Sequence, residues 1–204
     1  MNKKAIQIVY WGSLWGIAEA TLGYVLHMAA IQLPGVPGFV MFPVAFYFMR
    51  KSYLASGKAD AVFQVALVAA LIKCCDFLIT GNVPIRILNP ALSILLEGLA
   101  VALVFAYAER RKTDVGFASV FSMGVLWRAV FLIYLFLISL IDLPAALVTD
   151  GLQVSLRFLL LESFVNAILM FVYLKIEKTA RVVEVTPVVA YAALATAIML
   201  TLAF

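Results

Sequence analysis

The chain has 204 residues, of which 66% are hydrophobic and only 13% are charged, and its mean hydropathy is +1.10. Soluble domains are typically about half apolar and about a quarter charged, so this composition excludes an ordinary water-soluble enzyme and predicts an integral membrane protein. The net charge of +4 comes from short basic clusters beside apolar runs, which is typical of membrane topology and not of a nucleic-acid-binding surface.

Seven apolar segments have helical lengths and lack the period-two alternation of a barrel strand. They are residues 5–29, 36–50, 59–80, 88–108, 115–141, 151–174 and 187–204. We therefore predict an all-α, polytopic membrane bundle with six core transmembrane helices and a C-terminal seventh. Residues 1–204 form one integral membrane domain, within which 187–204 either span the bilayer or form a peripheral helix.

Basic residues recur on one side of the membrane if the segments alternate in direction. They are Lys3, Lys4, Arg50, Lys51, Lys58, Arg110, Arg111, Lys112, Lys175, Lys178 and Arg181. The positive-inside rule therefore predicts a cytoplasmic N-terminus for a multi-pass protein of the cell membrane. Two connections on the opposite side, residues 32–38 and 80–86, contain prolines and glycines and are predicted to be irregular. Because irregular backbone near a membrane must be buried in protein or line a wet cavity, they indicate a lidded outer vestibule.

Polar and ionisable side chains interrupt the apolar segments and their outer ends. They are Glu19, His27, Lys73, Asp76, Arg86, Asn89, Glu97, Arg128, Arg157 and Glu162. A charge that faces lipid near the bilayer centre costs about 2.5–3.5 kcal/mol on insertion scales, so these groups must pair, point inward or meet water. Most lie in the outer halves of the segments, which favours a substrate pocket open to the extracellular side.

Helical spacing groups these residues further. Lys73 and Asp76 are three apart and can pair within one helix. Glu97, Arg128 and Glu162 fall near the midplane, where they form either a structural ion network or part of the substrate site. His27, near the outer interface, braces a loop, contacts the ligand or binds a metal.

Small residues four apart, Gly12, Gly16 and Ala20, give the first segment a face that another helix can approach closely. That face serves either packing within the bundle or contact with a partner. The sequence has no His-Glu-x-x-His motif, no phosphate-binding Gly-x-x-x-x-Gly-Lys-Ser/Thr loop and a single histidine. We therefore expect no metal, no cofactor and no ATPase within the chain.

Residues 11–27 (WGSLWGIAEATLGYVLH) and 89–98 (NPALSILLEG) resemble segments of uncharacterised proteins placed near the substrate-binding S components of energy-coupling factor (ECF) transporters. The resemblance implies capture of a small organic micronutrient, such as a vitamin or its precursor, and delivery by docking to a transmembrane T subunit with two ATPases. It also implies that Gly12, Gly16 and Ala20 contact the T subunit. Two alternatives stay open: an intramembrane enzyme that uses Glu19, Glu97 or Glu162 as acid or base, and a non-catalytic subunit of a larger membrane complex.

Overall fold

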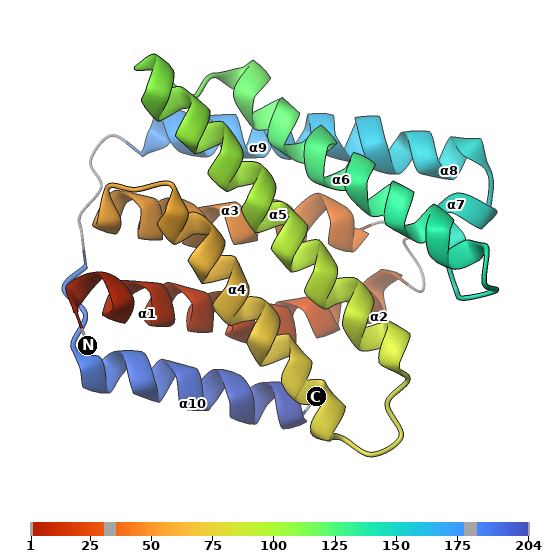
Figure 1. Cartoon of the computed structure of the whole chain (residues 1–204), viewed down its shortest axis with the longest axis horizontal. Helices are drawn as coiled ribbons and strands as arrows, with labels where there is room; N and C mark the ends of the chain where they lie inside the picture. The colour runs from red at the N-terminus through yellow and green to blue at the C-terminus, as the bar shows by residue number, and fades with distance from the viewer. Residues whose placement is uncertain (1, 31–35, 178–182, 204) are drawn as a thin grey trace.

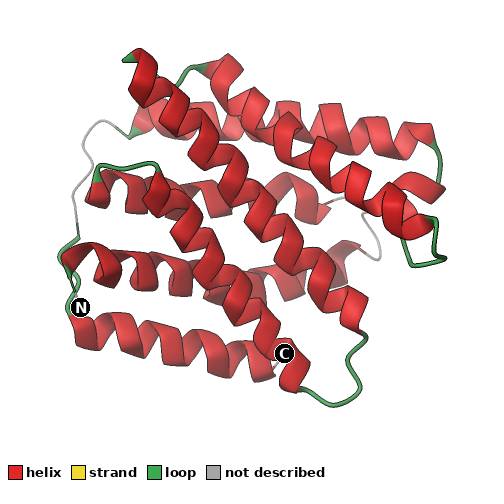
Figure 2. Ribbon diagram, viewed as in Figure 1, coloured by secondary structure: helices red, strands yellow, loops and turns green. Residues whose placement is uncertain are grey.

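The computed structural model describes residues 2–30, 36–177 and 183–203 of the chain, and within them every regular element is a helix (Figure 2). Each of the seven apolar segments forms helix. The elements are α1 (Lys3–Ala18), η1 (Glu19–Gly23), α2 (Tyr24–Ala30), α3 (Val36–Ser56), α4 (Asp60–Cys74), η2 (Cys75–Leu78), α5 (Pro84–Arg111), α6 (Phe117–Ser139), α7 (Ala146–Thr149), α8 (Leu152–Leu156), η3 (Arg157–Glu162), α9 (Ser163–Ile176) and α10 (Pro187–Ala203). The all-α prediction is therefore confirmed for the described residues.

The first of the two irregular connections is shorter than predicted. Residues 32–35 lie outside the described residues, but α3 already begins at Val36 and includes Pro37 and Gly38. Proline is tolerated in the first turn of a helix because its missing N–H has no partner there. The second connection is irregular over residues 79–83, and Pro84 begins α5 for the same reason.

The helices form two crossed layers (Figure 1). One layer is the row α10, α1, α3 and α9, and the other is made of α4, α5 and α6, which lie across that row. Large apolar side chains fill the space between the layers, among them the fully buried Trp15, Phe42, Phe46 and Phe105. The C-terminal helix α10 packs along α1 and buries Ala190, Ala197 and Thr201, so it belongs to the bundle.

Four stretches of helix are long and apolar enough to cross a membrane: Asp60–Leu78, Pro84–Arg111, Phe117–Ser139 and Leu152–Ile176. Their outward faces carry exposed apolar side chains such as Leu71, Leu103 and Ile133, each more than half exposed. Exposing so large an apolar surface to water would be unfavourable for a monomer, whereas lipid tails solvate such a surface. The fold is therefore that of a membrane protein.

Basic side chains gather at one end of the bundle, which we call the basic end: the start of α1, the end of α3, the start of α4 and the ends of α5 and α9. Lys4 Nζ pairs with Asp60 Oδ2 at 2.7 Å and joins the starts of α1 and α4. Glu177, just beyond α9, receives Lys51 Nζ at 2.5 Å, Arg50 Nε at 3.3 Å and the Tyr173 hydroxyl at 2.6 Å. This clasp ties the end of α3 to the end of α9.

Replacing Glu177 with glutamine is expected to lower the melting temperature at pH 7 by a few degrees. Burial raises the pKa of Glu177, but hydrogen bonds from Lys51, Tyr173 and Arg50 outweigh that effect and hold the pKa below its ordinary value. A carboxylate whose folded pKa is depressed stabilises the protein above its unfolded pKa, about 4.3, and loses this contribution as the pH falls through the folded pKa. Thermal melts of both proteins between pH 7 and pH 3 should therefore converge at the acidic end. If the difference between the two melting temperatures stays constant over this pH range, the ionised carboxylate of Glu177 does not stabilise the fold in this way.

Candidate functional site

A cavity of about 810 Å³ lies at the end of the bundle opposite to the basic end. We call it the Glu19 cavity. It is lined by Glu19, Ala20, Gly23, Tyr24, Lys73, Asp76, Ile79, Asn82, Val83, Ile85, Arg86, Ile87, Asn89, Pro90, Pro144 and Thr201. Five of the polar residues singled out in the sequence, Glu19, Lys73, Asp76, Arg86 and Asn89, thus converge on one cavity from three separate helical segments.

Glu19 enters the cavity from a widened turn of the first helix. The π-helical turn η1 begins at Glu19 and ends at Gly23, and such single wide turns often occur at functional sites because they re-aim the following side chains. Trp15, fully buried one turn earlier, donates its Nε1–H to Glu19 Oε1 at 2.9 Å. This bond fixes one carboxylate oxygen and orients the group.

The end of the third segment supplies an ion pair. Helix α4 tightens into the 3₁₀ turn η2, and Lys73 Nζ lies 2.6 Å from Asp76 Oδ2. The pairing predicted from the three-residue spacing is therefore confirmed. Asn82 Nδ2 donates to the backbone oxygen of Asp76 at 3.0 Å and holds the following connection against the turn.

Further polar lining comes from α5 and from Thr201, which the sequence analysis did not single out. Asn89 Oδ1 accepts the hydroxyl of Tyr134 on α6 at 2.8 Å, which orients its amide. Thr201 reaches the cavity from α10, and the sequence does not distinguish it from Thr196, the other threonine of that segment. The exposed Arg86 forms no ion pair with any described residue, so its guanidinium is open to an incoming group.

Two of the three predicted midplane charges, Arg128 and Glu162, form a cluster of their own away from the Glu19 cavity. Arg128, with no exposed surface, donates to Asn166 Oδ1 at 2.6 Å and to the Gly38 oxygen at 3.0 Å, and lies 3.7 Å from Glu162 Oε2. Its guanidinium also lies 4.5 Å from the ring of Trp127. We call these residues the Arg128 cluster. It joins α3, α6 and α9 across the bundle and does not line the Glu19 cavity.

Two other predicted residues, Glu97 and Arg157, also do not line the Glu19 cavity. Glu97 is buried on α5, eight residues and therefore about 12 Å of helix beyond Asn89, and it forms no ion pair with a described residue. Arg157, at the start of η3, lies 6.0 Å from the ring of Phe39. His27 lies within α2, and its side chain is outside the described part of the structure.

The structure also corrects the placement of the small-residue face. Gly12 and Gly16 are buried against Val68 and Ile72 of α4, where a Cβ on Gly12 would lie 2.6 Å from the Val68 Cβ. Ala20 is buried beside the Glu19 cavity. A face of small residues allows close helix approach whether the neighbour is internal or external. Here the neighbour is internal, so this face is not exposed for a T subunit.

The described residues contain no group of three or more histidine, cysteine, aspartate or glutamate side chains able to hold a metal ion. The cavity instead offers hydrogen-bonding and charged groups on an apolar wall. Comparisons with known protein families, with curated proteins and with solved structures found no match to this chain.

Proposed function

We propose that the protein is a membrane-embedded capture subunit that binds a small organic micronutrient in the Glu19 cavity. The observation that carries the proposal is the convergence of Glu19, Lys73, Asp76, Arg86 and Asn89 on one cavity of about 810 Å³. Ligand sites in proteins are typically clefts of about 300–1,000 Å³ with apolar walls and a few placed polar groups. Ile79, Ile85 and Ile87 supply such walls here.

The charges of the cavity suggest the class of ligand. Lys73 and Asp76 neutralise each other, and the other charged groups that line the cavity are the carboxylate of Glu19, which Trp15 orients, and the guanidinium of Arg86. A carboxylate accepts hydrogen bonds from ammonium, N–H or O–H groups, whereas guanidinium binds carboxylate or phosphate. A zwitterionic or multiply polar molecule satisfies both, with its donor group at Glu19 and its acid group at Arg86.

The proposed topology has six or seven membrane spans and a cytoplasmic N-terminus. The basic end then faces the cytoplasm, in agreement with the positive-inside rule, and the Glu19 cavity opens to the outside. Since the chain has no phosphate-binding loop, we propose that energy comes from a T subunit and two ATPase subunits. Because Gly12 and Gly16 are covered by α4, the T subunit would dock on another surface.

Ligand binding to the purified protein tests the proposal. A thermal-shift panel of vitamins, precursors and other zwitterionic micronutrients should contain a compound that raises the melting temperature. Glu19→Gln and Arg86→Gln should each weaken its binding about tenfold or more, because a hydrogen bond to a charged group contributes about 1.5–3 kcal/mol. Arg110→Gln, at the basic end and outside the cavity, is the matched control and should bind like the unmodified protein.

Two results would overturn the proposal. One is a broad panel without any stabilising compound, and the other is unchanged affinity in both cavity variants. Conversion of the bound compound to a product by the purified chain, abolished by Glu97→Gln, would instead support the intramembrane enzyme. Co-purification from native membranes addresses the partners, since ATPases should be recovered with the chain if it delivers its ligand by docking.

A further inference from the structure

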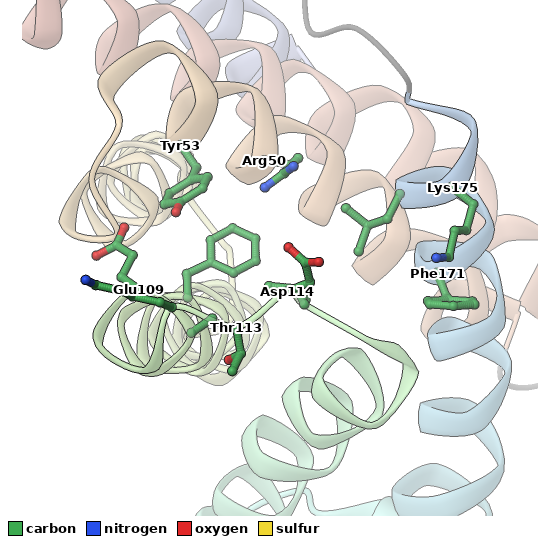
Figure 3. A pocket seen from close by; sticks show the side chains of 12 residues that line it. Arg50, Tyr53, Glu109, Thr113, Asp114, Phe171 and Lys175 are labelled. Atoms are coloured by element: carbon green, nitrogen blue, oxygen red, sulfur yellow. The ribbon is translucent and has the colours of Figure 1, made fainter.

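A second pocket, of about 420 Å³, lies at the basic end (Figure 3). We call it the Arg50 pocket. It is lined by Arg50, Tyr53, Phe105, Ala108, Glu109, Lys112, Thr113, Asp114, Val115, Phe171, Leu174 and Lys175, from α3, α5, the α5–α6 connection and α9. Sequence reasoning assigned these basic residues to topology alone and did not anticipate the pocket.

The chain turns sharply to build this pocket. Lys112 ends α5 in the left-handed region, at φ 52°, and its N–H bonds back to the last turn of the helix. The turn carries Thr113 and Asp114 over the pocket, where the Asp114 carboxylate and the tip of Arg50 face each other across the opening (Figure 3).

Opposite charges line this pocket without pairing across it. Lys112, Lys175, Glu109 and Asp114 form no ion pair with any described residue, and Arg50 is held from the side by Glu177 through its Nε. Some other charges at the ends of the bundle do pair, as Lys4 with Asp60 and Lys73 with Asp76. A ligand that carries both a positive and a negative group could form charge-assisted hydrogen bonds with the acidic and the basic side chains of this pocket.

The floor of the pocket is apolar and aromatic. The rings of Tyr53 and Phe105 lie 4.6 Å apart, and Lys175 Nζ lies 5.2 Å from the ring of Phe171. Lys175 and Lys112 stand at helix ends, where long basic side chains reach the level of the lipid headgroups. The pocket thus combines apolar walls with two signs of charge at the depth where a membrane meets water.

We propose that the Arg50 pocket binds a phosphoethanolamine group. The phosphate lies against Arg50 and Lys175, the primary ammonium lies against Asp114, and the carbon skeleton packs on Phe171 and Leu174. This chemistry is found in the headgroup of phosphatidylethanolamine and in water-soluble phosphoethanolamine. The site is separate from the Glu19 cavity, so this inference does not depend on the proposed function.

Lipid-dependent melting temperatures of the detergent-purified full chain test this site. Short-chain phosphatidylethanolamine should raise the melting temperature with a saturable dose response. Short-chain phosphatidylcholine, whose quaternary ammonium has no N–H donor, and phosphatidylglycerol, which has no ammonium, should stabilise less at equal concentration. Soluble phosphoethanolamine distinguishes the source: stabilisation at comparable concentration supports a free ligand, and stabilisation by the lipid alone supports a membrane headgroup.

Matched variants distinguish lipid binding in the pocket from a general effect of surface charge. Asp114→Asn and Lys175→Gln should each raise the half-saturating concentration of phosphatidylethanolamine about tenfold. Arg110→Gln removes a charge from the same end but does not line the pocket, and should leave that concentration unchanged. Melting without lipid checks that each variant folds. Equal stabilisation by phosphatidylcholine, or unchanged half-saturation in both pocket variants, would overturn the proposal.

Discussion

Replacing Arg128 with methionine is expected to lower the free energy of unfolding by about 3–5 kcal/mol, because removing one partner of a buried charge pair leaves the other uncompensated. The variant would leave Glu162 buried without the guanidinium that lies 3.7 Å from its Oε2. It would also remove the donors to Asn166 Oδ1 and to the Gly38 oxygen. Thermal or SDS-induced unfolding of the purified protein measures the loss.

A double variant identifies the cause of this loss. Arg128→Met combined with Glu162→Met removes both charges and replaces them with side chains of similar length, and exchange of a buried ion pair for apolar groups is often neutral or stabilising. We expect the double variant to be more stable than Arg128→Met alone by at least about 1 kcal/mol. A double variant no more stable than the single one would show that the two residues are not coupled. A single variant within 1 kcal/mol of the unmodified protein would contradict the central role of Arg128.

Gly98→Ala should also destabilise the protein, by about 1–3 kcal/mol, although alanine is the better helix former. A Cβ at this position would lie 2.2 Å from the Cβ of Ala66, well inside van der Waals contact, at the contact between α4 and α5. Since these two helices carry Lys73, Asp76, Arg86 and Asn89, a shift between them should also disturb the Glu19 cavity. Unfolding measurements together with ligand binding would report both effects.

A compensating exchange provides the control. Adding Ala66→Gly to Gly98→Ala transfers one methyl group between facing positions and should restore most of the lost stability. Gly23→Ala is the matched control at a helical glycine whose added Cβ would have its nearest neighbour at an ordinary 3.6 Å, and should leave stability unchanged or slightly higher. If the exchange fails to rescue Gly98→Ala, close packing against Ala66 is not the reason for the glycine.

Some features of the site were predictable because their causes are local. The Lys73–Asp76 pair follows from three-residue spacing on one helix, and the irregular chain at 79–83 follows from its glycine and the proline after it. The partner of Arg128 was not predictable in this way. Glu97 and Glu162 have similar predicted depths in the membrane, and Arg128 pairs with Glu162, which is the last residue of the wide turn η3. Residue spacing does not reveal such a turn, because it depends on what packs around the helix.

The sequence alone determined that the chain is an all-helical membrane protein, where its helices lie and which polar groups must avoid lipid. Each of these follows from the free energy of transferring individual segments and side chains out of water, a property of short stretches of chain. Only the tertiary structure decided that Gly12 packs against α4, that α10 adds Thr201 to the Glu19 cavity and that Lys112 turns the chain over the Arg50 pocket. These depend on the rotation and neighbours of each helix, which are fixed by contacts between residues far apart in the sequence.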